Sequence, residues 1–80
     1  MREPEIYDRL NDIFRDVIGD DSIVLAPETT AEDIEGWDSV THISLLVSIE
    51  TQYRIKIRTD EMETLRNVGE MVNLIRRKAA

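Results

Sequence analysis

The chain has 80 residues, a net charge of −7 and no cysteine. A chain of this length is typical of one small domain, so we expect a single domain over residues 1–80. The lack of cysteine excludes a disulfide framework, a thiolate metal site and a thiol nucleophile. No apolar run approaches the ~20 residues that span a bilayer, and residues 1–20 carry alternating charges, unlike a signal peptide. We therefore expect no membrane span and a cytoplasmic location.

The charge is unevenly distributed along the chain. Residues 1–38 hold 12 acidic and 3 basic residues (−9), whereas residues 39–80 hold 5 acidic and 7 basic ones (+2). A negative protein repels phosphate backbones, so nucleic acid is not expected as a partner. Basic protein partners, attracted mainly to the first half, are the better expectation.

The first periodic segment covers residues 4–18 and predicts a helix. Its apolar residues recur at steps of three and four, which places them on one helical face. They are Ile6, Leu10, Ile13, Phe14, Val17 and Ile18. Pro4 suits the first helical turn, and Gly19 is a typical stop.

Residues 20–37 are rich in turn residues and predict a long loop. Within it Ile23, Val24 and Leu25 are apolar and are expected to pack against the core. Thr30 and Asp33 have the spacing of a capping box, which predicts one helical turn over residues 31–34.

A second helix is predicted from Asp38 or Ser39 to about Tyr53. Its apolar residues cover most of the circumference, a pattern typical of a helix packed by neighbours on several sides. They are Val40, Ile43, Leu45, Leu46, Val47, Ile49 and Tyr53. On this interpretation Val47 lies in the core, where an unpaired charge would cost several kcal/mol.

Residues 53–59 alternate between polar and apolar residues as a strand would. A lone strand in a helical chain has no pairing partner, so an extended linker anchored by Ile55 and Ile57 is predicted instead.

A short third helix follows. Asp60 and Glu63 have capping-box spacing at its start, and Met62 and Leu65 are expected to face inward.

Asn67 and Glu70 repeat the capping signature at the start of a fourth helix. Basic residues in its last turn, Arg76, Arg77 and Lys78, complement the helix dipole. Its apolar face consists of Val68, Met71, Val72 and Ile75. The predicted fold is therefore all-α: a small four-helix bundle of three longer helices and one short third helix, with a long loop between the first two.

The pair Asp38-Ser39 has three interpretations. The first is capping, because Asp is a strong N-cap and Ser is unremarkable at the first helical position. The second is a hydrolase, since Ser39 and His42 are one helical turn apart, but the GxSxG elbow is absent and so small a bundle leaves little room for a substrate cleft. The third is modification of the Ser39 hydroxyl, because a helix N-terminus favours an attached anion. Capping by Asp38 and modification of Ser39 are compatible.

The stretch GWDSVTHISLLVSIETQYRIKI resembles the phosphopantetheine attachment region of acyl carrier proteins, whose signature is a D-S-L/M/I centre that opens a long helix. The resemblance extends over essentially all 80 residues. It implies that Ser39 receives 4′-phosphopantetheine from coenzyme A through a phosphopantetheinyl transferase, and that Asp38 is part of what the transferase recognises beside its magnesium ion. The thiol of the arm would then supply what a chain without cysteine lacks.

The resemblance further implies a carrier of acyl or aminoacyl thioesters, not an enzyme. Its expected partners are the transferase, an acyl or aminoacyl ligase or transferase that loads the arm, and downstream synthases. A monomer is expected. The alternative is an unmodified helical adaptor that binds partners through the second helix.

Two departures from the family pattern concern the second helix. Val40 stands where leucine is usual, and Glu50 is the only carboxylate after Asp38, whereas fatty-acid carriers have several. This pattern suggests a stand-alone carrier of a specialised pathway, recognised mainly through apolar contacts. The expected partner-recognition residues are Trp37, Val40, His42, Ile43 and Glu50. For Trp37 we also expect packing against the bundle, and for His42 a place on the helix surface.

Overall fold

The computed structural model describes residues 2–79 and is all-helical. Its elements are α1 (Glu3–Ile18), the 3₁₀ turn η1 (Ala31–Asp33), α2 (Ser39–Tyr53), α3 (Thr59–Glu63) and α4 (Val68–Lys78). The predicted small helical bundle, with a short third helix and a long first loop, is confirmed. None of the helices in this range has the length and apolar character that crossing a membrane requires.

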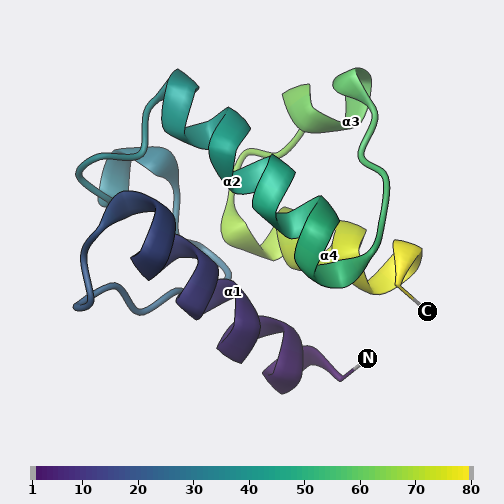
Figure 1. The fold of residues 1–80 in the computed structure, drawn as a ribbon, viewed down its shortest axis with the longest axis horizontal. Helices are drawn as coiled ribbons and strands as arrows, with labels where there is room; N and C mark the ends of the chain where they lie inside the picture. The colour runs from purple at the N-terminus through teal and green to yellow at the C-terminus, as the bar shows by residue number, and fades with distance from the viewer. Residues whose placement is uncertain (1, 80) are drawn as a thin grey trace.

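Helix α1 packs against both α2 and α4. Helix α3 lies on the side of α2 opposite to α1 (Figure 1). Between the helices lies one core of buried apolar side chains. Its members are Ile6, Leu10, Ile13, Phe14, Ile23, Leu25, Trp37, Leu45, Leu46, Ile49, Tyr53, Ile55, Ile57, Val68, Met71, Val72, Leu74 and Ile75. The spacing that predicted the apolar faces of α1 and α4 is thus confirmed, with Leu74 added to the face of α4.

The first half of the long loop is held against α1. Arg15 Nε donates to the Ile23 carbonyl at 2.8 Å, and the Leu25 N–H donates to Asn11 Oδ1 at 2.8 Å. Ile23 and Leu25 are buried as expected, but Val24 is 75% exposed. The expectation for Val24 was wrong because successive side chains of an extended segment point to opposite sides.

The second half of this loop lies beside the start of α4. The Val68 N–H donates to the Thr29 carbonyl at 2.9 Å, and the Gly69 N–H donates to the Pro27 carbonyl at 2.8 Å. A Cβ atom on Gly69 would lie 3.0 Å from that Pro27 oxygen. Glycine therefore permits the close approach of the two backbones.

The predicted capping residues of η1 and α4 are found at the predicted places, with a complete capping box at η1. The Thr30 N–H donates to Asp33 Oδ2 at 3.0 Å, at the start of η1. At the start of α4 the Glu70 N–H donates to Asn67 Oδ1 at 2.8 Å. These hydrogen bonds satisfy backbone donors at the helix starts.

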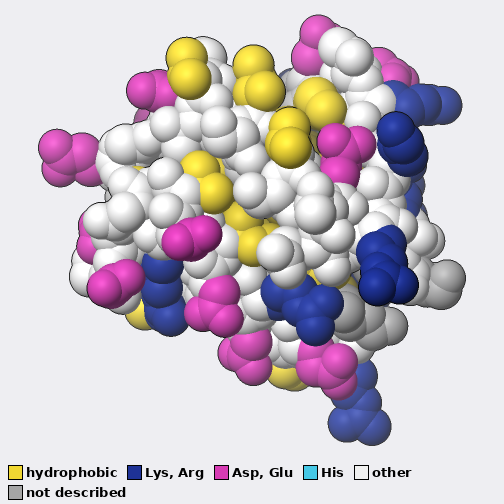
Figure 2. Space-filling view, viewed as in Figure 1, with side chains coloured by type: hydrophobic (Ala, Val, Ile, Leu, Met, Phe, Trp, Pro, Cys, Tyr) yellow, Lys and Arg dark blue, Asp and Glu magenta, His cyan; other side chains and the backbone are white. Residues whose placement is uncertain are grey.

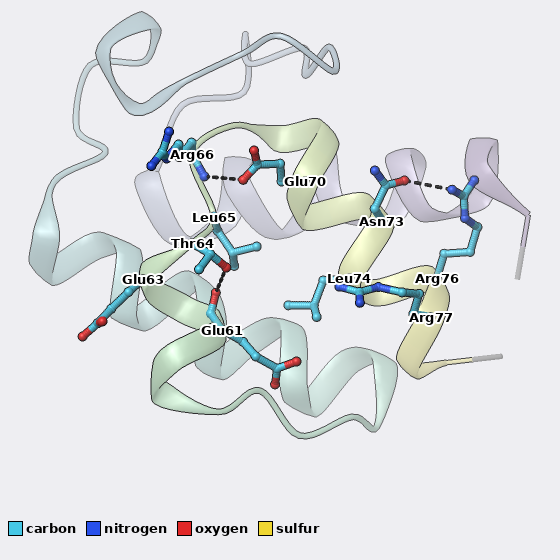
Figure 3. A pocket seen from close by; sticks show the side chains of 10 residues that line it. All are labelled: Glu61, Glu63, Thr64, Leu65, Arg66, Glu70, Asn73, Leu74, Arg76 and Arg77. Atoms are coloured by element: carbon cyan, nitrogen blue, oxygen red, sulfur yellow. Dashed lines mark hydrogen bonds between the residues drawn. The ribbon is translucent and has the colours of Figure 1, made fainter.

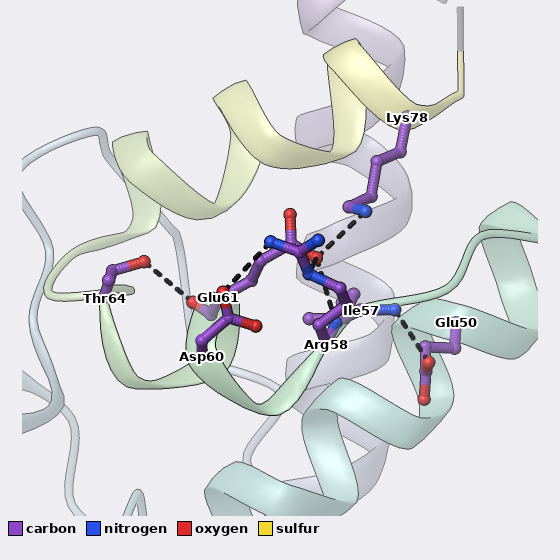
Figure 4. Close-up of polar contacts among 7 residues, drawn as sticks. All are labelled: Glu50, Ile57, Arg58, Asp60, Glu61, Thr64 and Lys78. Carbon is purple, nitrogen blue, oxygen red and sulfur yellow. Dashed lines mark hydrogen bonds and ion pairs between the residues drawn. The ribbon is translucent and has the colours of Figure 1, made fainter.

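The predicted cap of α3 by Asp60 and Glu63 is wrong. The capping carboxylate is Glu61, which accepts the Arg58 N–H at 2.9 Å and pairs with Lys78 Nζ at 2.9 Å (Figure 4). These contacts hold the pKa of Glu61 below its usual value, the hydrogen bond from Arg58 being the largest cause. The helix starts earlier than predicted because the extended linker ends directly after buried Ile57.

The linker between α2 and α3 is extended, as predicted. Ile55 and Ile57 are buried, and the Ile57 N–H donates to Glu50 Oε2 at 2.9 Å (Figure 4). Just before the linker, the Tyr53 hydroxyl donates to the Ile6 carbonyl of α1 at 2.8 Å. Burial raises the pKa of Tyr53 to about 12, so this donor keeps its proton at neutral pH.

Helix α2 is buried on one side only, which corrects the expectation that neighbours surround it. Leu45, Leu46 and Ile49 are fully buried. In contrast, Val40 is 76%, Ile43 60% and Val47 53% exposed. The bundle has too few helices to cover both sides of α2, so its second apolar face remains at the surface.

Adjacent positions of α2 provide a direct test of this one-sided burial. Leu46→Ala removes a fully buried side chain and is expected to lower the free energy of unfolding by about 2–5 kcal/mol. Val47→Ala alters a surface position and is expected to change it by roughly 0.5 kcal/mol or less. Urea denaturation followed by circular dichroism measures both values. Equal losses for the two variants would contradict one-sided burial.

Candidate functional site

Trp37 fixes the place where the long loop ends and α2 begins. Its side chain is 7% exposed and packs edge-to-face on Phe14 of α1, with ring centroids 5.0 Å apart and planes at 86°. This arrangement is the favoured geometry of an aromatic pair. The expected packing of Trp37 against the bundle is therefore confirmed.

Asp38 is the N-cap of α2, as predicted. Its Oδ1 atom accepts the Thr41 N–H at 2.9 Å. This hydrogen bond is the largest cause that holds the pKa of Asp38 below its usual value, so the exposed carboxylate is ionised at neutral pH. Ser39 follows as the first residue of α2, and its side chain is exposed.

His42 is half-buried and bound to Trp37. Trp37 Nε1–H donates to His42 Nδ1 at 3.1 Å, and the two rings stack with centroids 6.0 Å apart and planes at 24°. A neutral imidazole that accepts at Nδ1 carries its hydrogen on Nε2. His42 thus lies partly at the surface, as expected, but it also supports the tryptophan that precedes the cap.

A cavity of about 520 Å³ lies beside Ser39. Its lining residues are Ala31, Trp37, Asp38, Ser39, His42, Ile43, Leu65 and Arg66. Five of these were predicted as site residues, and the cavity brings them together. Ala31 from η1, and Leu65 and Arg66 from the α3–α4 loop, were missed because they come from segments far from Ser39 in the sequence.

Two predicted recognition residues, Val40 and Glu50, lie outside this cavity. Val40 forms an exposed row on α2 with Ile43 and Val47, at positions i, i+3 and i+7, which we call the apolar stripe. Figure 2 shows hydrophobic side chains at the surface over α2. Val47 was missed because the sequence pattern assigned it to the core. Glu50 is half-buried, and its carboxylate accepts the Ile57 N–H.

Comparison with known proteins decides the family. A family model described as "Phosphopantetheine attachment site" matches residues 8–75. The chain belongs to the acyl carrier protein family. As a member it is a carrier of acyl thioester intermediates, with a covalently attached 4′-phosphopantetheine as its cofactor.

Individual relatives resemble this carrier over most of their length. An acyl carrier protein of Picosynechococcus is 32% identical over 75 residues, covering 92% of this chain and 91% of that protein. One of Clostridium acetobutylicum is 28% identical over 71 residues, covering 89% and 92%. The solution structure of a holo acyl carrier protein from Geobacter metallireducens is 48% identical, with a TM-score of 0.86, covering 91% of this chain and 84% of that one.

The residues around the cavity fit the cofactor. Its attachment requires an accessible hydroxyl, and Ser39 is exposed beside the cavity. The phosphate carries negative charge, which the N-terminal end of a 15-residue helix favours. When bound, the group supplies a thiol for thioester formation.

The cap at Asp38 can be tested by its dependence on pH. Asp38→Ala removes the acceptor of the Thr41 N–H and should lower the urea midpoint at pH 7, whereas Asp38→Asn retains an acceptor and should lower it less. Because the folded pKa is depressed, the stabilisation is present above the unfolded value of 3.8 and is lost as the pH falls through the lower folded value. The difference between wild type and Asp38→Ala should therefore shrink in acid. A difference that stays constant down to pH 2 would contradict this role of the carboxylate.

Proposed function

We propose that Ser39 Oγ carries the 4′-phosphopantetheine arm. The observation that chiefly supports this is the position of Ser39: exposed, at the first residue of α2, and beside the cavity. Ser44, also exposed, belongs to the middle of α2, where backbone N–H groups are already bonded within the helix. Ser44 and Ser48 are not among the residues that line the cavity.

Attachment at Ser39 is a group transfer from coenzyme A. A bond forms between Ser39 Oγ and the phosphorus that bears the pantetheine chain, and the bond from that phosphorus to the oxygen of the adenosine 3′,5′-bisphosphate breaks. The serine proton passes to a base of the transferase. Asp38 remains ionised and exposed next to Ser39, which suits the proposed recognition by the transferase and its magnesium ion.

We further propose that the chain is a carrier without catalytic activity of its own. In a serine hydrolase a carboxylate orients the histidine and the histidine activates the serine. Here His42 Nδ1 accepts from Trp37, and the Asp38 carboxylate accepts the Thr41 N–H. The unmodified adaptor is the less favoured alternative, because the family match concerns the attachment site itself.

The expected partners follow from the carrier function. They are a phosphopantetheinyl transferase, an acyl or aminoacyl ligase or transferase that loads the thiol, and the synthases that use the cargo. We propose that residues 1–80 act as a single monomeric domain in the cytoplasm. A dedicated role in a specialised pathway, rather than in general fatty-acid synthesis, is likewise part of the proposal.

Recognition of these partners is proposed to rest on the apolar stripe together with Trp37 and His42. Helix α2 and its cap provide only two carboxylates, Asp38 and Glu50, and Glu50 is half-buried and accepts the Ile57 N–H. Helix α2 therefore presents little acidic charge to a basic partner surface. Exposed Val40, Ile43 and Val47 offer apolar contact area instead.

Modification of Ser39 is tested by mass. Incubation with coenzyme A, magnesium and a broad-specificity phosphopantetheinyl transferase should add the mass of one phosphopantetheine to the wild type. Ser39→Ala should gain nothing, because it lacks the accepting oxygen. Ser44→Ala is the matched control and should be modified as the wild type is.

Two outcomes would oppose this assignment. Modification that survives in Ser39→Ala and is lost in Ser44→Ala would move the site to Ser44. A wild-type protein that stays unmodified by several transferases, while a control carrier is modified, would favour the adaptor.

Partner choice is tested by turnover across a salt series. The holo-protein should be a poorer substrate of fatty-acid elongation enzymes than an ordinary fatty-acid carrier. Its turnover should also depend less steeply on salt, because screening weakens charge attraction far more than apolar contact. Ser44→Glu, which adds an acid at an exposed position of α2, should increase the salt dependence, whereas Ser44→Gln should not.

The proposal on partner choice would be refuted if the elongation enzymes turned over the wild type and the ordinary carrier equally, with the same steep salt dependence. It would mean that the acids absent from α2 are unimportant for recognition.

A further inference from the structure

Arg66 lies in the short loop between α3 and α4 and lines two cavities. One is the cavity beside Ser39. The other, of about 700 Å³, lies between α3 and α4, and Figure 3 shows its lining residues. Leu65 also lines both cavities, so Leu65 and Arg66 form the wall that the two share.

The guanidinium of Arg66 has no partner within residues 2–79. The Arg66 backbone N–H donates to Glu70 Oε2 at 3.0 Å, and Figure 3 shows the guanidinium directed away from that carboxylate. Three other cations of the second half of the chain are paired: Arg58 with Asp60, Arg76 with Glu3, and Lys78 with Glu61. Arg66 therefore retains its donors for a ligand.

The cavity that Ser39 and Arg66 both line has positive groups that would favour an anion. The N-terminal end of α2 carries partial positive charge, and Arg66 adds a full charge across the same cavity. The Asp38 carboxylate also lines this cavity and stays ionised, and its Oδ1 atom accepts the Thr41 N–H. A guanidinium presents a planar fork of donors that matches phosphate oxygens.

We propose that Arg66 is a positioning residue that binds the phosphodiester linking the arm to Ser39. The inference rests on the proposed attachment at Ser39. An acidic cargo with a carboxylate would offer similar oxygen chemistry, but the phosphodiester is bonded directly to Ser39 Oγ, whereas the cargo lies at the far end of the arm. The phosphodiester is therefore the anion that Arg66 meets.

This contact would connect the modification to the loop between α3 and α4. Leu65, next to Arg66, is half-buried against the core, and Asn67 on its other side caps α4. Pairing of Arg66 with the phosphodiester would hold Leu65 at the wall of the Ser39 cavity. Partner enzymes would then meet a different loop surface in the apo and holo forms.

The experiment compares apo and holo forms of wild type, Arg66→Gln and Arg77→Gln. Arg77→Gln is the matched control, since it removes the same charge from a residue that lines only the α3–α4 cavity. Intact mass first establishes that each holo form carries one phosphopantetheine. The measurements are the ³¹P resonance of the phosphodiester, the Arg66 side-chain Nε–H signal, and the melting temperatures at low and high salt.

In the wild type, modification should shift the Arg66 Nε–H signal. The ³¹P resonance should differ between wild type and Arg66→Gln and should be unchanged in Arg77→Gln. The change in melting temperature from apo to holo should be lower in Arg66→Gln by roughly 1–8 °C, the range for one exposed ion pair in a domain of this size. High salt should remove that difference.

An unchanged ³¹P resonance in fully modified Arg66→Gln, with the same apo-to-holo melting shift as the wild type, would overturn the proposal. So would an effect of Arg66→Gln that appears only after the arm is loaded with a dicarboxylic acyl chain and not with a neutral one, because Arg66 would then bind cargo. If the wild type gained no mass, the proposed attachment of the arm would be refuted. That outcome is distinguishable from a failure of the proposal on Arg66.

Discussion

The burial of Trp37 is the constraint on which the site depends. Its ring packs edge-to-face on Phe14 of α1, and its indole N–H donates to His42 one turn into α2. Both contacts fix where the loop ends, so the next residue, Asp38, caps the helix and Ser39 begins it at the surface. The exposed serine is thus held in place by a side chain that belongs to the core.

The cavity beside Ser39 depends on three segments that are distant in the sequence. Ala31 comes from η1, and Leu65 and Arg66 come from the α3–α4 loop. The junction of the long loop with α2 contributes Trp37, Asp38, Ser39, His42 and Ile43. Backbone hydrogen bonds join the long loop to the start of α4. The ion pair between Glu61 and Lys78 joins α3 to the end of α4. The geometry around Ser39 therefore depends on how α4 packs, although α4 contributes no residue to the cavity wall.

Three carboxylates of α2, its cap and α3 form hydrogen bonds within the fold, which a count of acidic residues does not reveal. Asp38, Glu50 and Glu61 each accept a backbone N–H, so their carboxylates serve local structure. Around Ser39 the exposed groups include the Asp38 carboxylate, the apolar stripe on α2 and Arg66. In our proposals the apolar stripe contacts partners and Arg66 contacts the phosphodiester, so the two roles belong to different parts of the surface.

The sequence by itself determined the features that arise from contacts within a few residues. The helices α1 and α4, the cap at Asp38, the position of Ser39 and the extended linker follow from periodicity and from hydrogen bonds that span three or four residues. The sequence did not determine which face of α2 is buried, because both faces are apolar and only the packing of α1 and α4 distinguishes Leu46 from Val47. The tertiary structure likewise decided the start of α3 at Thr59, which follows the burial of Ile57. It also decided that Arg66 lines the same cavity as Ser39, because the path of the α3–α4 loop brings together residues that no local pattern connects.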